Sequence, residues 1–228
     1  MKILALDTAT EACSVSLGIG DRSIDRYVEL ERGHAEQLLP MVDAVLAEGG
    51  IALSSLDAIA FGRGPGGFTG VRLAASVAQG LGFGVDVGVV PISDLAAVAQ
   101  RVIQMNPDVR RILVVNDARM REVYWARFSV DAGPVPEGDE RVSAAVDVLL
   151  PERAESAAAW VAAGRGLAAW PDLAARCLSA GATVQASLLP RASEVLALAR
   201  PIVAAGKVLP PEAALPIYVR DRVAVPSS

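Results

Sequence analysis

A glycine-rich segment carries the clearest chemical signal in the sequence. It reads Gly-Arg-Gly-Pro-Gly-Gly-Phe-Thr-Gly from Gly62 to Gly70 and lies between a short apolar run and a helical pattern. Its glycines let the backbone approach a ligand closely, and the start of the next helix exposes unpaired amides that suit a phosphate or a carboxylate. No Gly-Lys-Ser or Gly-Lys-Thr follows, so it is not a Walker A loop, and a tight connection between strand and helix explains it equally well.

Asp7 is the second candidate for chemistry. It ends the first predicted strand and is followed by the hydroxyls of Thr8, Thr10 and Ser14. Ligands bind at the carboxyl ends of strands in α/β sheets, and a carboxylate beside hydroxyls suits such an edge. An aspartate that only caps a turn is the alternative explanation. The candidate ligand or phosphate loop therefore consists of Asp7, Gly64, Gly66, Gly67 and Thr69.

A basic turn between two predicted strands is the third candidate. It runs from Asp117 to Glu122, and its residues Arg119 and Arg121 are candidate contacts for RNA phosphates. A solvated hairpin, in which these arginines pair with Asp117 and Glu122, is the ordinary alternative. The chain has 21 basic and 26 acidic residues and a net charge of −5, the wrong sign for binding nucleic acid by phosphate neutralisation alone, so any such contact must be local or supplied by a partner.

The counts of histidine and cysteine limit the metal chemistry of the chain. The 228 residues include one histidine, His34, and two cysteines, Cys13 and Cys177, so the usual zinc sites with several such ligands are excluded. We expect no metal site, core positions for both cysteines, and a packing or hydrogen-bonding role for His34. Two cysteines also give no disulfide framework, which fits a reducing compartment.

The elements that must position these residues begin with three strands, after which helices and strands alternate. Apolar and alternating runs predict strands at 2–7, 12–19, 23–30, 56–61, 85–90, 111–116 and 123–130. Helical spacing predicts helices at 35–48 and 71–81, and Ser93 caps a third that runs to about residue 104. The signals weaken beyond Asp131, where we predict a strand at 160–163, a helix at 194–205 and an extended tail at 210–228.

This order predicts an α/β protein with mixed sheets that helices cover. We expect an N-terminal lobe over residues 1–105 and a smaller lobe with an extended tail over residues 106–228. No apolar stretch reaches the length of a membrane span, and the apolar run at 3–6 is too short for a signal peptide. We therefore expect a cytoplasmic protein that contacts no membrane.

The chain resembles the TsaB (YeaZ) family over almost its whole length. Its most specific shared segment is Gly-Pro-Gly-Gly-Phe-Thr-Gly at 64–70. The resemblance implies an actin-like (ASKHA) fold of two lobes, each with the order βββαβα and a mixed sheet, the second lobe being reduced. The shared segments are Met1 to Thr10, Gly33 to Pro40, Gly62 to Arg72, Asp117 to Tyr124 and Pro216 to Arg220.

The resemblance implies a subunit without catalytic residues that is required to make threonylcarbamoyladenosine in tRNA. Such a subunit binds and organises TsaD, which transfers the threonylcarbamoyl group to N6 of the adenosine next to the anticodon in tRNAs reading codons that begin with A. The implied partners also include the ATPase TsaE, a second copy of the chain when TsaD is absent, and tRNA indirectly through the complex. No cofactor is implied for the isolated chain, whereas ATP or ADP is implied at the partner interface.

The resemblance also assigns the partner contacts to helices of the N-terminal lobe. The helix at 35–48 carries apolar residues over more of its circumference than one core face needs. Burial of both sides within one chain is the alternative. The predicted interface consists of Leu38, Leu39, Met41, Val42, Val45, Leu46 and Arg72.

Two other functions remain open. An actin-like ATPase or small-molecule kinase would use Asp7 and the glycine-rich loop for a nucleotide, but the turns that follow Asp7 and Asp117 lack the glycine of active members. Side chains in these turns would crowd a triphosphate. A metallopeptidase would need a metal site, against which the single histidine argues. Turnover of ATP by the isolated chain distinguishes the first of these functions from the subunit.

Overall fold

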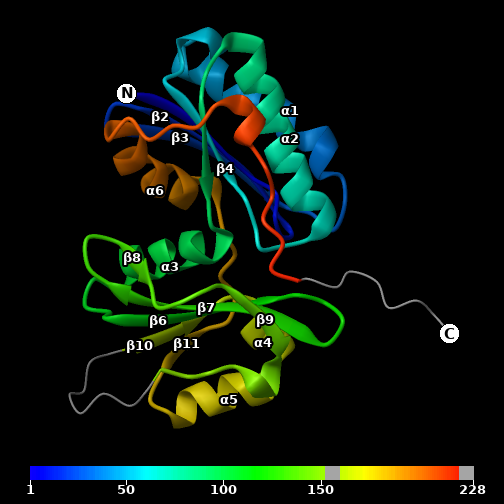
Figure 1. The fold of residues 1–228 in the computed structure, drawn as a ribbon, viewed down its shortest axis with the longest axis vertical. Coiled ribbons are helices and arrows are strands. Elements are labelled where there is room, and N and C mark those ends of the chain that lie inside the picture. Colours follow the sequence, from blue (N-terminus) through cyan, green and yellow to red (C-terminus); the bar gives the residue numbers. More distant parts are fainter. Residues whose placement is uncertain (152–159, 221–228) are drawn as a thin grey trace, which may run out of the picture.

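The computed structural model describes residues 1–151 and 160–220, which form two mixed β-sheets lying one above the other (Figure 1). This confirms the predicted α/β fold, including the three strands that precede the first helix. Buried apolar side chains from helices pack on both faces of each sheet. No helix in these described ranges is long and apolar enough to cross a membrane.

The first sheet has the strand order β3-β2-β1-β4-β5. Its central strand β1 is antiparallel to β2 and parallel to β4. Residues on both faces of β1 are buried, which is why this strand reads as a continuous apolar run in the sequence. The strands are β1 (Lys2–Asp7), β2 (Ala12–Ile19), β3 (Arg22–Glu29), β4 (Ala58–Gly62) and β5 (Val89–Ile92).

Three helices pack on the first sheet, and we call the sheet with these helices the first lobe. Helices α1 (His34–Gly49) and α2 (Phe68–Val85) cover one face, and α6 (Ala192–Ala204) covers the other (Figure 1). The predicted strand at 85–90 is wrong at its start, because α2 continues to Val85. The helix ends where Asp86 adopts a left-handed conformation with φ 56°, and β5 begins only at Val89.

The second sheet has the order β11-β10-β6-β7-β8, and β9 pairs with β7 beside β8. We call this sheet with α3, α4 and α5 the second lobe. Helix α3 covers the face toward the first lobe, and α5 packs on the opposite face. The elements are β6 (Arg111–Asp117), β7 (Glu122–Val130), β8 (Pro134–Pro136), β9 (Arg141–Ala144), β10 (Trp160–Ala163), β11 (Thr183–Gln185), α3 (Asp94–Met105), α4 (Gly166–Ala169) and α5 (Pro171–Ser179).

Helix α6 returns the chain to the first lobe after the second sheet is complete. The prediction counted this helix with residues 106–228, yet Val195 and Leu196 pack against Ile3 in the first sheet. The start of α6 is also fixed there, because the Ala192 amide donates to Ser14 Oγ at 2.9 Å. The chain stays on this lobe up to the start of the predicted tail, since Leu209 pairs with Val89 at the edge of the first sheet. Residues 221–228 of that tail lie outside the described ranges.

Several short elements of the second lobe were missed by the sequence prediction. Strands β8, β9 and β11 and helices α4 and α5 lie between the predicted strand at β7 and the predicted helix at α6. The three strands have three or four residues each, too few for an alternating pattern to stand out. Helix α5 has nine residues and begins at Pro171, so it offers little more than two turns of apolar spacing.

Candidate functional site

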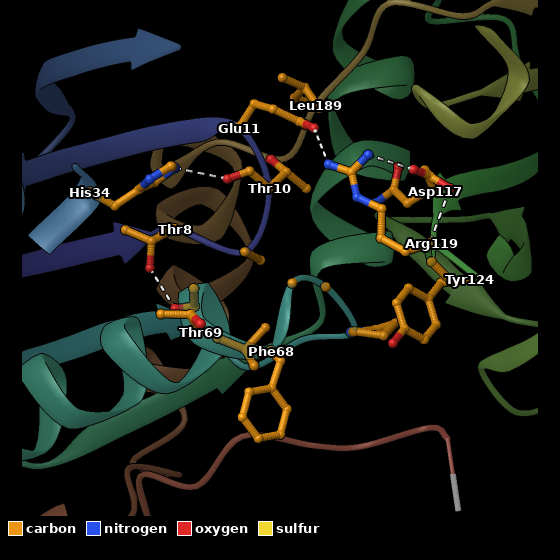
Figure 2. Close-up of a pocket in the computed structure, with 18 of the residues that line it drawn as sticks. Thr8, Thr10, Glu11, His34, Phe68, Thr69, Asp117, Arg119, Tyr124 and Leu189 are labelled. Atoms are coloured by element: carbon orange, nitrogen blue, oxygen red, sulfur yellow. Dashed lines mark hydrogen bonds and ion pairs between the residues drawn. The ribbon is translucent and has the colours of Figure 1, made fainter. Parts of the chain in front are cut away.

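A cleft of about 1090 Å³ opens between the two lobes. It lies at the carboxyl ends of β1, β4 and β6, the edge at which the sequence predicted a ligand site. Figure 2 shows Thr8, Thr10 and His34 of the first lobe facing Arg119 and Asp117 of the second. The cleft is lined by the turn after β1, the start of α1, the glycine-rich loop, the hairpin between β6 and β7, and tail residues 217–220.

The glycine-rich loop packs against the turn that follows β1. The Gly67 amide donates to the Ala9 carbonyl at 2.7 Å, and Thr8 Oγ1 donates to the Gly70 carbonyl at 2.7 Å. A side chain at Gly66 would approach Ala9 Cβ to 2.8 Å, and one at Gly70 would strike the Thr8 backbone. These glycines are thus required by a contact within the chain, as the tight-connection alternative holds.

The structure separates the predicted loop residues by depth. Gly67 and Thr69 are exposed and line the cleft, Gly66 is half-buried in its wall, and Gly64 is buried behind it. Asp7 lies beneath the turn, fully buried and outside the cleft lining. Its Oδ1 accepts the Ala9 N–H at 3.1 Å, which is a turn-capping geometry. Burial raises the pKa of the Asp7 carboxyl, against the opposing effect of its hydrogen bonds.

Ion pairs cross the cleft between the lobes. Arg119 Nη2 lies 3.2 Å from Glu11 Oε1 of the first lobe, and within the second lobe Arg119 Nη1 lies 3.1 Å from Asp117 Oδ2 (Figure 2). Arg165 Nη2 lies 2.8 Å from Glu29 Oε2, and its Nη1 lies 3.8 Å from Glu11 Oε2. These two guanidinium groups therefore already face carboxylates, and an anion entering the cleft competes with Glu11 for both of them.

The tip of the hairpin between β6 and β7 has an unusual backbone. Arg119, Met120 and Arg121 all adopt the left-handed conformation, with φ values of 60°, 51° and 64°. This conformation costs roughly 1 kcal/mol or more for each residue with a Cβ. Asp117 offsets part of that cost, because its Oδ1 accepts the Arg119 N–H at 3.1 Å. The turn directs Arg119 into the cleft lining and leaves Arg121 exposed, with no hydrogen bond or ion pair to the described residues.

The C-terminal tail closes one side of the cleft mouth, a contact that the sequence prediction missed. The Ile217 amide donates to the Arg63 carbonyl at 2.8 Å, and Arg220 pairs with Glu122 and donates to the Ala118 carbonyl at 3.3 Å. The tail thereby joins the glycine-rich loop to the hairpin of the second lobe. The tail is extended and its partners lie about 100 residues or more away in the sequence, so no periodic pattern in the tail predicts these contacts.

An aromatic pair holds Arg72 at the same mouth. Its guanidinium carbon lies 3.1 Å from the Phe68 ring centroid and 4.7 Å from that of Tyr218, a cation–π arrangement. Arg72 Nη1 also donates to the Phe68 carbonyl at 3.1 Å. Phe68 is 56% exposed and Tyr218 is 46% exposed. Phe68 and Tyr218 both line the cleft, so Arg72 of helix α2 is held beside the cleft without lining it.

His34 ties the start of α1 to the turn after β1. Its Nε2 lies 2.9 Å from the Thr10 carbonyl oxygen, so the single histidine has the hydrogen-bonding position expected for it (Figure 2). Within the described residues, no group of three or more His, Cys, Asp or Glu side chains is placed to hold a metal ion.

The predicted partner surface on α1 needs correction. Leu38, Val42, Val45 and Leu46 are buried in the core between α1 and the first sheet, so they cannot contact a partner. Their spacing matches a single core-facing stripe of the helix. Leu39 is 47% exposed on the outer side, and Met41 is half-buried against the core. On α2, Phe83 is 59% exposed.

Comparison with known proteins shows close relatives along almost the full chain. Residues 28–206 match the family model described as TsaD, tRNA N6-adenosine threonylcarbamoyltransferase. The chain is 40% identical to the tRNA threonylcarbamoyladenosine biosynthesis protein TsaB of Escherichia coli (strain K12) over 228 residues, covering 98% of this chain and 96% of the relative.

Two solved structures from Pseudomonas aeruginosa are similar to the whole fold. One is described as YeaZ, with a TM-score of 0.84, 42% identity, and coverage of 95% of this chain and 99% of the other. The second is described as an uncharacterized protein with similarity to peptidase YEAZ. It has a TM-score of 0.86 and 42% identity, and the match covers 96% of this chain and 99% of the other.

Proposed function

Because the chain belongs to the TsaB (YeaZ) family of tRNA threonylcarbamoyladenosine biosynthesis proteins, we propose that it is a non-catalytic subunit that binds and organises the TsaD transferase. In this role it contributes to threonylcarbamoyl transfer to N6 of the adenosine next to the anticodon, in tRNAs that read codons beginning with A. The ATPase TsaE is the third component of the complex.

The internal contacts of the residues around the cleft support the proposal that the chain is not itself catalytic. Its glycine-rich loop is packed on the turn after β1, and Asp7 lies buried beneath that turn. Arg119 and Arg165 already face Glu11 across the cleft. A nucleoside triphosphate would have to displace these internal contacts and would find no exposed carboxylate at position 7 to position it.

The outer faces of α1 and α2 are the surface proposed for TsaD, and for a second copy of the chain when TsaD is absent. Leu39 and Phe83 are about half exposed there, and large apolar side chains of this kind are typical anchors of protein interfaces. Gly80 and Gly84 of α2 have no other atoms within 4 Å of the position of a Cβ, so a partner helix can approach α2 closely. Arg72 and Met41 border this surface.

The proposal assigns the remaining ligands to the assembled complex in the cytoplasm. ATP or ADP binds at the interface with the partner, and Gly67 and Thr69 are the loop residues exposed toward it. The hairpin tip supports an RNA contact, because Arg121 is exposed and Arg119 can exchange Glu11 for a phosphate.

Nucleoside mass spectrometry tests this function. Cells that lack the TsaB protein should lose threonylcarbamoyladenosine, and expression of this chain should restore it, whereas the purified chain alone should turn over no ATP. Robust ATP hydrolysis or phosphate transfer by the isolated chain would instead support an actin-like ATPase or kinase that uses Asp7 and the glycine-rich loop.

A further inference from the structure

Two fully buried carboxyl groups meet beneath the cleft. Asp7 ends β1 and Asp94 begins α3, and neither side chain is accessible to solvent. Each has one oxygen with a backbone partner: Asp7 Oδ1 accepts the Ala9 N–H, and Asp94 Oδ2 accepts the Gly64 N–H. The Asp94 amide in turn donates to the Gly64 carbonyl at 3.1 Å. Asp94 is therefore bound on two sides to the glycine-rich loop.

The other two oxygens face each other across Gly62. Asp7 Oδ2 and Asp94 Oδ1 are buried and have no hydrogen-bond donor among the described groups. A Cβ on Gly62 would lie 2.6 Å from Asp7 Oδ2 and would also strike Asp94 Oδ1, so both oxygens point at the same place. Two ionised carboxylates this close in a buried site repel each other strongly, whereas one proton between them gives each oxygen a partner.

Among the described residues, no cationic group forms a hydrogen bond with either carboxyl group of the pair. His34 of α1 and Cys13 of β2 are the titratable groups that face Asp7. Glu140, which precedes β9, faces Asp94, and Arg63 is paired with Glu140 at 3.2 Å. The acidic neighbour on this side favours a neutral Asp94 rather than a charged one.

We propose that Asp94 is a positioning residue that shares one proton with Asp7, and that this carboxyl–carboxylate pair holds the glycine-rich loop against the turn after β1. The pair joins three elements that converge under the cleft, namely the ends of β1 and β4 and the start of α3. It also keeps the Asp7 carboxylate inside the protein and away from any ligand in the cleft.

The direction of titration agrees with a proton held mainly by Asp94. Burial, and then the charge of Asp7, raise the pKa of Asp94 well above its usual range, and burial raises the pKa of Asp7. The two groups titrate as a unit, so each step belongs to the pair. Because the folded state holds a proton that the unfolded chain releases, stability falls as the pH rises from the ordinary aspartate range through the raised value.

Asparagine variants of the full chain test the shared proton. In Asp94→Asn the side-chain oxygen still accepts the Gly64 N–H, and the NH₂ group donates to Asp7 without needing a proton. Asp7→Asn offers the mirror arrangement toward Asp94. Each single variant should fold. The difference in Tm between Asp94→Asn and the unmodified chain should shift by about 3 °C in favour of the variant as the pH rises from 5 to 9.

The double variant separates a shared proton from simple charge burial. With both positions changed to Asn, the two free groups are NH₂ donors that face each other without an acceptor, so the double variant should melt below either single variant. If unfavourable charge burial were the only effect, removing both charges would give the highest Tm, and that result overturns the proposal.

A spectroscopic readout reports the proton itself. Carbon-13 NMR of aspartate-labelled protein at pH 7 should show one protonated buried carboxyl group in the unmodified chain, and that signal should be absent in Asp94→Asn. Two ionised carboxylates at positions 7 and 94 at this pH would contradict the proposal, whatever the Tm values are.

Discussion

The central strands β1 and β6 of the two lobes end at the same cleft, but the turns that follow them differ. In the first lobe, β1 ends at a buried carboxyl group, and the following turn packs so tightly on the glycine-rich loop that Gly66 and Gly70 have no room for a side chain. In the second lobe, β6 ends in a hairpin whose three tip residues are left-handed and exposed. The first turn is built for internal packing, whereas the second presents Arg119 to the cleft and Arg121 to solvent at a cost in backbone strain.

The largest effect is expected where the first lobe is packed most tightly. Gly70→Ala should lower the free energy of unfolding by about 3 kcal/mol, because the new Cβ strikes the Thr8 backbone, which cannot rotate away. Gly80→Ala in the same helix is the matched control, since nothing lies within 4 Å of its Cβ position, and it should stabilise by about 0.5–1 kcal/mol. Urea denaturation measures both. A loss below about 1 kcal/mol for Gly70→Ala would show that the turn and loop are loosely packed.

A charge introduced on the outer face of the first lobe should weaken binding to TsaD and leave the stability of the chain unchanged. Leu39→Glu should weaken the complex with TsaD by about tenfold or more, because a half-exposed apolar anchor becomes a charge. Its Tm should stay close to that of the unmodified chain. Leu178→Glu makes the same change at a 58% exposed leucine of the second lobe and should leave TsaD binding unchanged. Calorimetric titration with purified TsaD compares the two, and equal losses would remove the distinction between the lobes.

Reversing a charge at the hairpin tip should weaken the binding of tRNA. Arg121→Glu should weaken tRNA binding by the assembled complex and reduce the slope of log K against log salt by about one, as expected for one lost phosphate contact. Lys207→Glu alters the charge equally at an exposed position of the first lobe and is the control. Filter binding over a salt series measures the slope. An unchanged slope for Arg121→Glu would mean that the hairpin tip contacts no phosphate.

The smallest effect concerns the strain of that tip. Met120 has φ 51° and is 71% exposed, so Met120→Gly removes an unfavourable Cβ without losing core contacts. The variant should be more stable by about 0.5 kcal/mol, since the strain relieved slightly exceeds the entropy that glycine adds to the unfolded chain. Thermal unfolding gives the value, and a clear loss of stability would mean that the tip is not strained.

The first lobe was largely predictable from the sequence, and the interior of the site was not. Continuous or alternating apolar runs marked β1, β2 and β4, and Ser93 marked the start of α3, where its hydroxyl accepts the Ala96 N–H. Asp94 reads as an ordinary acidic residue in a first helical turn, because its pairing with Asp7 depends on folding. The apolar residues of α1 could not be assigned to core or surface until the helix was placed on the sheet.

Helix α6 has a consequence for how this protein is made. The ribosome makes all strands of the first sheet long before it makes α6 (Ala192–Ala204). This helix buries Ile3 and Ala5, which lie on one face of the sheet. At roughly 5–20 residues per second, that face stays uncovered for about 5–20 seconds after the last strand of the sheet has been made. Apolar surface exposed in this way promotes aggregation, so a truncated product that ends before α6 should aggregate or be degraded more readily than the full chain.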